Sequence, residues 1–336
     1  ESISGAAFCR RRSCVQMGLL FAVHGALAVG ILWSVMTLGV YITFRILDIA
    51  DLTVDGSFAT GGAVSGVLIA HGVHPLLSLS AAFAAGMLAG LATGLLHTKI
   101  KIHVLLASIL TMIALYSVNI RIMGKANTPL LGVNTMMTFF TDKCGFTAAN
   151  ASLAVGAVFV VCIVVLMYWF FGTEIGSAMR ATGNNERMVR ALGVNTDTMK
   201  MLGLMLANGF VALSGALVAQ SQGYADVGMG TGVIVIGLAS IIIGEVVFGK
   251  RFAFWYRLSA VVFGSVIYRI IIAIVLQLGL KSTDLKLFTA IIVAASLSVP
   301  VIKARVAHRR RSAIPGTKAA DAEIVRDTDV TDTIGK

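Results

Sequence analysis

Three aspartates, Asp48, Asp51 and Asp55, lie at helical spacing in an otherwise apolar part of the chain. Carboxylates arranged in this way can relay protons within a membrane, which is the chemistry of an ion-coupled transporter. The Thr, Gly and Ser residues that follow them also favour a helix start, where a short carboxylate accepts hydrogen bonds from free backbone N–H groups. We favour capping, and we take Asp51, Asp55, Gly56 and Ser57 as candidates for a helix break along a pathway.

Glu245 and Arg269 are the other charges expected at the depth of a membrane. An isolated charge there is unfavourable unless it meets a partner or reaches water. Two interpretations are open: either these two side chains pair with each other, or Glu245 lies at the cytoplasmic end of its segment. Glu245 therefore joins the candidates for the pathway.

No pattern in the sequence predicts a catalytic, metal or nucleotide site. His71 and His74 have the spacing of two metal ligands, but no third ligand is near in the sequence. The stretch from Gly244 to Lys250 approaches a phosphate-binding loop, but Arg251 replaces the hydroxyl residue that would hold magnesium. We expect no catalytic residues and no cofactor or metal bound by this chain.

The composition indicates that a membrane positions these residues. Of the 336 residues, 57% are hydrophobic and 13% are charged, whereas soluble domains carry about 25% charged residues. Mean hydropathy is +0.89. These values exclude a soluble enzyme, a disordered protein and a disulfide scaffold. The expected fold class is all-α, a polytopic transmembrane helix bundle.

The charges divide the chain into about nine hydrophobic segments. Their expected bounds are Met17–Phe44, Gly56–Ala70, Leu76–Leu96, Ile102–Met123, Asn150–Phe171, Met201–Gln220, Gly232–Phe248, Phe252–Leu278 and Leu287–Ile302. The second and seventh segments are short for full spans, which need about 20 residues. Short, Gly-rich segments of this kind often form half-helices that line a pathway.

The basic residues predict the orientation of these segments. Lys and Arg gather after the third, fifth, seventh and ninth segments, and such loops face the cytoplasm. The net charge of +11 has this origin, and no basic and aromatic stripe indicates nucleic acid as a partner. Arg10–Arg12 argue against an external N-terminus, so the orientation of that end stays open.

Four regions are expected along the chain. Residues 1–16 form an N-terminal extension without fixed structure, and residues 17–302 form the transmembrane domain. The loop 173–200 belongs to that domain, and residues 303–336 form a cytoplasmic tail of mixed charge. Within the third segment, Gly86, Gly90 and Gly94 form a ridge almost without side chains, which we interpret as a helix-packing surface.

The stretch Thr173–Lys200 is the only substantial polar insert between the expected spans. Met188, Val189 and Leu192 give part of it a short apolar face. A short amphipathic helix in a cytoplasmic loop can dock onto another protein, and a solvated basic loop is the plainer alternative. The residues alone leave both interpretations open.

This loop resembles the cytoplasmic loop of ABC-importer permeases in the branched-chain amino acid and ribose permease class. The matching positions are Gly176, Ala181, Gly183, Asn185, Gly193, Val194 and Asn195. The stretch from Asp51 to Ser57 resembles the D-L-S/T-V motif after the first core helix of these permeases, and the resemblance covers roughly residues 17–302. Within the class, ILDIADLTVDGSF and NIRIMGKAN are most similar to a bacterial subfamily assigned to tryptophan or tyrosine uptake.

The resemblance implies a membrane permease subunit of a bacterial ABC uptake transporter in the inner membrane, with an aromatic or branched-chain amino acid as solute. It implies four partners: a dimeric cytoplasmic ATPase that binds ATP and magnesium, a second permease subunit in a homodimer, an external substrate-binding protein and the lipid bilayer. The loop residues that would couple to the ATPase are Gly176, Arg180, Gly183, Asn185, Glu186, Arg187, Arg190, Gly193 and Asn195. The alternative is an ion-coupled secondary transporter that uses membrane carboxylates.

Overall fold

The structure is a computed structural model that describes residues 2–145, 147–249, 253–277, 287–294 and 298. Contacts divide the chain into two compact units, Glu1–Val293 and Ala294–Lys336. All of the helices and strands below belong to the first unit. The expected tail 303–336 and the end of the ninth segment lie outside the described residues.

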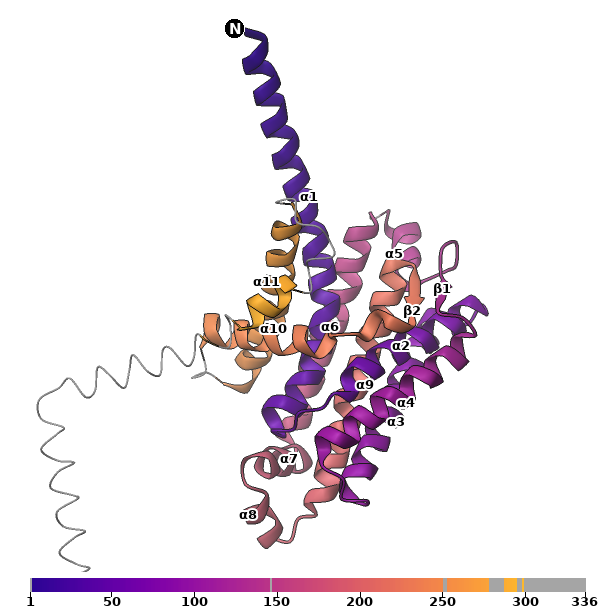
Figure 1. Cartoon of the computed structure of the whole chain (residues 1–336), viewed down its shortest axis with the longest axis vertical. Helices are drawn as coiled ribbons and strands as arrows, with labels where there is room; N and C mark the ends of the chain where they lie inside the picture. Colours follow the sequence, from indigo (N-terminus) through magenta and orange to yellow (C-terminus); the bar gives the residue numbers. More distant parts are fainter. Residues whose placement is uncertain (1, 146, 250–252, 278–286, 295–297, 299–336) are drawn as a thin grey trace, which may run out of the picture. The chain divides into compact units, whose positions relative to one another are not determined.

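Apart from two short strands, the regular secondary structure of the described residues is helical (Figure 1). In chain order the elements are α1 (Ser2–Tyr41), η1 (Ile42–Ile46), α2 (Thr53–Ala70), α3 (Pro75–Thr98), α4 (Val104–Met123), β1 (Asn127–Pro129), α5 (Met136–Cys144), α6 (Ala148–Gly172), α7 (Glu174–Asn184), α8 (Glu186–Ala191), α9 (Thr196–Gln222), β2 (Tyr224–Asp226), η2 (Val227–Gly230), α10 (Val233–Phe248) and α11 (Phe254–Gln277).

Seven helical segments among the described residues are long and apolar enough to cross a membrane. They correspond to seven of the nine expected segments; the other two are α2 and the segment that begins at Leu287. The all-α polytopic fold class is thereby confirmed, with nine as an approximate count. The N-terminal region differs from the expectation, because α1 begins at Ser2 and includes most of the extension expected at 1–16.

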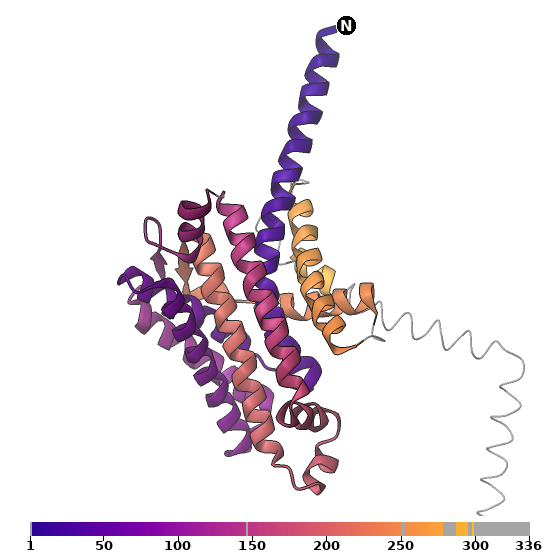
Figure 2. The ribbon, with the colours of Figure 1, turned by 180° about the vertical axis from the view of Figure 1, so that it is seen from behind.

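Helix α9 is the central element of the bundle. Every residue from Ala207 to Gln220 is buried, and a helix that is buried on all sides must be surrounded by other helices. Leu32 of α1 accepts a hydrogen bond from Ser214, and Ser57 of α2 donates one to Asn208. Figure 2 shows α6 beside α1 from behind, where Gly156 lies against Leu32.

Helix α3 packs against α9 along its glycine ridge. A Cβ atom at Gly86 would collide with the backbone of Asn208, and one at Gly90 would collide with the backbone of Leu204. Gly94 faces Met201 one turn further along. The absence of side chains therefore brings the two backbones into direct contact, as small-residue ridges do in membrane proteins.

Helix α2 begins in the middle of the bundle instead of at one end. It runs parallel to α9, since Ser57 bonds Asn208 and Ser65 bonds Gln220 further along both helices. Asn208 lies twelve residues after the start of α9 at Thr196, which corresponds to about 18 Å of helix. The segment between η1 and α2 thus leads the chain back into the interior.

Apart from the segments that lead into α2 and α10, loops lie at two ends of the bundle (Figure 1). A shallow pocket joins the α3–α4 loop to the α8–α9 loop and includes Lys101, Arg190 and Lys200; we name this the basic end. At the opposite end, β1 pairs antiparallel with β2, with Thr128 opposite Ala225. Helix α5 lies there too, and its Met136 N–H donates to Gln220 of α9.

Glu186 ties α8 to the start of α9 at the basic end. Lys200 Nζ lies 2.7 Å from one of its carboxylate oxygens, and Arg190 Nη2 lies 2.9 Å from the other. The Thr196 hydroxyl donates to the same carboxylate. The hydrogen bond from Lys200 holds the pKa of Glu186 below its ordinary value of 4.5, although partial burial opposes this.

The glycine ridge predicts that a bulky residue at Gly90 destabilises the bundle. Gly90→Leu should lower the free energy of unfolding by about 1–3 kcal/mol, because the new side chain must displace the backbone of α9. Thermal unfolding of the purified protein in detergent measures this loss. Gly25→Leu is the matched control, since a Cβ there meets nothing within 4 Å; an equal loss in both variants would contradict the close-packing interpretation.

The Glu186 tether predicts a pH dependence of the loop. Folding lowers the pKa of Glu186 below its ordinary value of 4.5. The tether is therefore fully formed at pH values above 4.5, and it is lost as the pH falls through the lowered pKa of the folded protein. Glu186→Gln removes it at neutral pH, and amide exchange across residues 186–200 should quicken about twofold to fivefold, as for a partly exposed ion pair. Glu174→Gln, an exposed change at the start of α7, is the control. Unchanged exchange in Glu186→Gln would show that the tether does not hold α8.

Candidate functional site

The first aspartate of the helix break caps the N-terminus of α2. Asp51 is 2% exposed. One of its carboxylate oxygens accepts the Thr53 N–H at 2.9 Å, and the other accepts from Asn208 Nδ2 at 2.7 Å. The Asn208 carbonyl oxygen in turn accepts from the Ser57 hydroxyl at 2.7 Å. Asp51, Ser57 and Asn208 thus form a buried polar connection that fixes the start of α2 against the middle of α9.

The second aspartate caps a different helix. Asp55 Oδ2 accepts the Gly232 N–H and Asp55 Oδ1 accepts the Ile234 N–H, both at 2.9 Å. These two N–H groups belong to the N-terminus of α10, 177 and 179 residues further along the chain. The N-terminal N–H groups of a helix lack partners within the helix and carry its positive dipole end, so a carboxylate is well suited to this position.

Helices α2 and α10 therefore start close together within the bundle. Asp51 and Asp55 lie one helical turn apart, and each accepts hydrogen bonds from a helix start. Two short helices with adjoining N-termini correspond to the short second and seventh segments expected from the sequence. Discontinuous helices that start inside a membrane bundle are typical of sites where transporters handle their solute.

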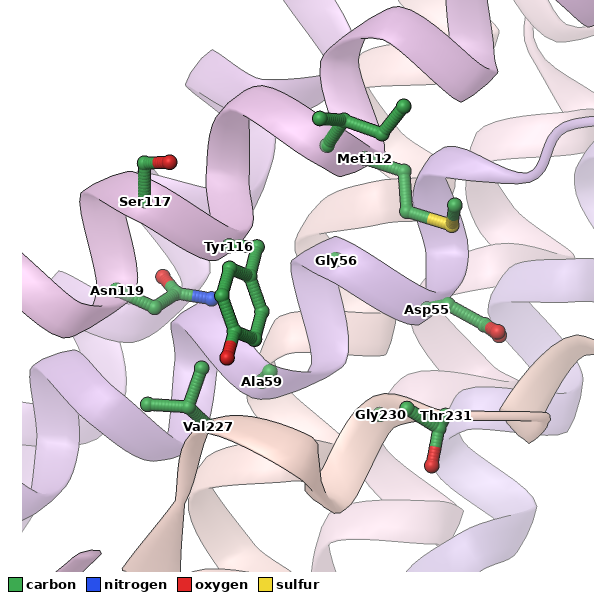
Figure 3. Close-up of a pocket in the computed structure, with 11 residues that line it drawn as sticks. Asp55, Gly56, Ala59, Met112, Tyr116, Ser117, Asn119, Val227, Gly230 and Thr231 are labelled. Carbon is green, nitrogen blue, oxygen red and sulfur yellow. The ribbon is translucent and has the colours of Figure 1, made fainter. Parts of the chain in front are cut away.

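A cavity of about 460 Å³ lies beside this junction. It is a half-open cavity bordered by α2, α4 and η2, and it is lined mostly by apolar atoms. Figure 3 shows Met112, Tyr116 and Asn119 extending from α4 toward Gly56 and Ala59 of α2. Gly56 lines the cavity, and a side chain at this position would meet Leu115 of α4.

Asn119 gives this apolar cavity an unpaired polar group. The residue is 1% exposed, and neither atom of its amide has a hydrogen-bond partner within the part of the chain that the structure describes. A buried amide without partners is unfavourable. Asn119 thus brings two N–H donors and a carbonyl acceptor to the wall of the cavity, which Asp55 also lines.

Glu245 lies near the C-terminal end of α10, away from the helix starts at this junction. Its carboxylate pairs with Arg45 of η1 at 2.7 Å. The structure thus gives Glu245 a partner other than the Arg269 of the first open interpretation. Arg269 instead stacks on the ring of Trp33, with Cζ 3.7 Å from the ring centroid. The sequence grouped these two charges because both were expected at the depth of a membrane, whereas the fold brings Arg45 of η1 against Glu245 of α10.

The asparagines and one glycine of the loop motif set the ends of its helices. The Asn185 side chain accepts the Met188 N–H at the start of α8, and the Asn195 side chain accepts the Asp197 and Thr198 N–H groups at the start of α9. Gly193 has φ of +85° between these helices, a conformation that glycine adopts without strain. These motif residues determine the shape of the loop.

Gly176, Gly183 and Arg180 attach α7 to the membrane helices. A Cβ at Gly176 would collide with the Phe170 carbonyl oxygen, and one at Gly183 would collide with the Ile46 carbonyl oxygen. Arg180 donates to the Phe171 carbonyl oxygen at 2.7 Å and lies over the Phe254 ring. Helix α7 thus contacts the ends of α6 and η1 directly, backbone against backbone.

A small exposed surface remains on α8. Arg187 is exposed, Met188 is 51% exposed and Leu192 is 73% exposed. We name these three residues the α8 face. Glu186 and Arg190 are instead occupied by the tether to α9. Of the loop residues proposed from the sequence, Arg187 is the one on this face.

Several residues of the site were not selected from the sequence. Asn208, Asn119 and Arg45 each make or offer a buried or charged interaction described above. An asparagine within an apolar segment is itself a signal, because such a residue needs a partner in a membrane. Among the described residues, no group of three His, Cys, Asp or Glu side chains is placed to hold a metal ion.

Comparison with known proteins finds permeases of transport systems. A family model described as branched-chain amino acid transport system / permease component matches residues 22–296. The chain is 43% identical over 265 residues to a tyrosine transport system permease protein of Clostridioides difficile, covering 79% of this chain and 86% of that protein.

More distant relatives belong to other transport systems. An uncharacterized protein of Rickettsia prowazekii is 34% identical over 78% of this chain and 92% of its own length. The ribose import permease protein of Escherichia coli K12 is 26% identical over 66% of each chain. No solved structure matches the chain. The match over residues 22–296, together with the membrane helices, confirms the resemblance found in the sequence, and the chain belongs to the permease-component family of branched-chain amino acid transport systems.

Proposed function

We propose that this permease component of an ABC transport system forms the inner-membrane pathway for an aromatic amino acid. Permeases of this kind work with an ATPase and a substrate-binding protein. The observation that carries the proposal is the junction of α2 and α10, where two helix starts meet beside a largely apolar cavity. The tyrosine transport permease among the relatives supports the aromatic solute.

The cavity beside the junction suits brief passage of such a solute. Its apolar lining accommodates a ring, the Asn119 amide offers hydrogen bonds, and Asp55 attracts an ammonium group. Few polar groups converge, so the cavity holds a solute weakly. We assign selection of the solute to the external substrate-binding protein.

Coupling to the ATPase runs through the α8 face. We place the basic end in the cytoplasm, because the Lys- and Arg-rich loops gather there. An ATPase that contacts Arg187, Met188 and Leu192 would move α8 and α7 together. Gly183 transmits this movement to Ile46, and the chain then leads through Asp51 to the start of α2. Displacement of the loop thereby shifts the junction between two arrangements.

The partners follow from this role. Two copies of the permease would enclose the pathway, and a dimer of ATPase subunits would bind ATP and magnesium beneath them. This chain would bind neither and would catalyse no reaction of its own. The alternative is an ion-coupled transporter that uses Asp51 or Asp55. The caps give both carboxylates a structural role that needs no proton transfer.

Reconstitution distinguishes these two mechanisms. In liposomes that contain the permease with its ATPase and binding protein, tyrosine should accumulate only with ATP. Asp55→Asn should retain more uptake than Asp55→Ala, because asparagine still accepts a backbone N–H whereas loss of a cap costs about 0.5–2 kcal/mol. Accumulation by the permease alone on a proton gradient, abolished equally by both variants, would overturn the ATP-driven proposal.

The α8 face predicts which substitutions weaken the binding of the permease to its ATPase. Leu192→Asp should weaken binding of the ATPase by about tenfold or more, as for a residue at the centre of an interface, while leaving thermal stability unchanged. Co-purification and titration in detergent measure this effect. Ile100→Asp is the matched control, since Ile100 is 64% exposed in the α3–α4 loop. Gly183 is unsuitable for this test because substitution there disturbs packing against Ile46. Full binding by Leu192→Asp would exclude α8 as the docking element.

A further inference from the structure

A second cavity, of about 450 Å³, lies between α10 and α11. Its wall includes Gly232 and Val235 at the start of α10 and Tyr268 and Arg269 of α11. Thr231 lines both this cavity and the one beside α4. The two cavities therefore adjoin the same short segment between η2 and α10.

Unpaired hydrogen-bond donors gather at this second cavity. The Nε and Nη2 atoms of Arg269 are buried and have no hydrogen-bond partner among the described residues. The same holds for the hydroxyl of Tyr268, which is 1% exposed, and for Nε1 of Trp33, which is 7% exposed. The guanidinium stacks on the Trp33 ring at 3.7 Å, and Tyr268 and Arg269 line the same cavity. We name these three residues the cluster.

In the described parts of the chain, no negatively charged acceptor bonds the donors of the cluster. The stack on Trp33 offsets part of the desolvation of the guanidinium, but it leaves the N–H groups of Arg269 Nε and Nη2 without a hydrogen-bond partner. Neighbouring α10 does not supply an acceptor, because its first N–H groups are donors and are bound to Asp55. A planar oxyanion fits the unbonded edge of a guanidinium through two parallel hydrogen bonds.

We propose that this cavity binds an oxyanion, a carboxylate or phosphate group, held by Arg269 and by the hydroxyl of Tyr268. Two sources share this chemistry. One is the carboxylate of the transported amino acid, an assignment that rests on the proposed function and is favoured by the shared wall at Thr231. The other is the phosphate of a lipid headgroup.

The indole of Trp33 provides a direct reporter of binding. The chain has three tryptophans, and Trp169 and Trp255 are 70% and 54% exposed. Replacing both with Phe in the full-length permease leaves Trp33 as the only indole. The protein in a maltoside detergent is titrated with L-tyrosine and, separately, with L-tyrosinamide, which lacks the carboxylate. A further titration uses dihexanoyl phosphatidylglycerol. Fluorescence is excited at a wavelength that indole absorbs and tyrosine does not.

A saturable change of Trp33 emission with L-tyrosine but not with L-tyrosinamide supports the site with the solute as its source. A change with phosphatidylglycerol alone supports the site with lipid as its source. Arg269→Gln should weaken either response about tenfold to a hundredfold, as loss of a charge-assisted pair does, and Arg269→Lys should restore part of it. Arg257→Gln, an exposed arginine of the same helix, should change nothing.

Tyr268→Phe removes only a hydroxyl and keeps the test decisive if Arg269→Gln fails to fold; it too should weaken the response. No change with any probe, an equal response to L-tyrosinamide, or undiminished affinity in the folded variants would overturn the proposal. The measurement uses the permease without its ATPase. Failure here therefore differs from failure of the proposed function, which is read from ATP-dependent uptake.

Discussion

The start of a helix inside a membrane exposes backbone N–H groups where no water can reach them. In this permease two helices start in this way, and Asp51 and Asp55 provide the acceptors. The requirement fixes much of the remaining architecture. Asp51 must be held by Asn208, which anchors α2 to α9, and Asp55 must remain beside Gly232, which anchors α10 to α2. The cavity beside α4 lies next to the place where both helices start.

The same junction is connected to the basic end through backbone contacts. Gly183 touches the carbonyl of Ile46, and only a short segment separates Ile46 from Asp51. The Glu186 tether joins α8 to the start of α9. No flexible side chain lies between the backbones of Gly183 and Ile46. The loop and the junction are thus linked by direct contacts.

The sequence predicted the helical segments, the polar loop and a helix break at Asp51 and Asp55, because hydrophobic periodicity and charge-free runs are local properties. It did not predict that Asp55 caps a helix 177 residues away or that Arg45 partners Glu245. Those pairings depend on which helices meet, and spacing along one chain carries no information about this. Helix α5 and the β1–β2 pair were also missed, since both are short and lie in a loop.

The polar residues of α9 have a consequence for biogenesis. Asn208 bonds Asp51 and Ser57, Ser214 bonds Leu32, and Gln220 bonds Ser65, Ser78 and Met136. Each of these partners precedes α9 in the chain. Since the ribosome makes the N-terminal part first, the complementary groups are already in the bilayer when α9 is inserted. Helix α9 therefore enters the bilayer after the residues that bond its polar side chains.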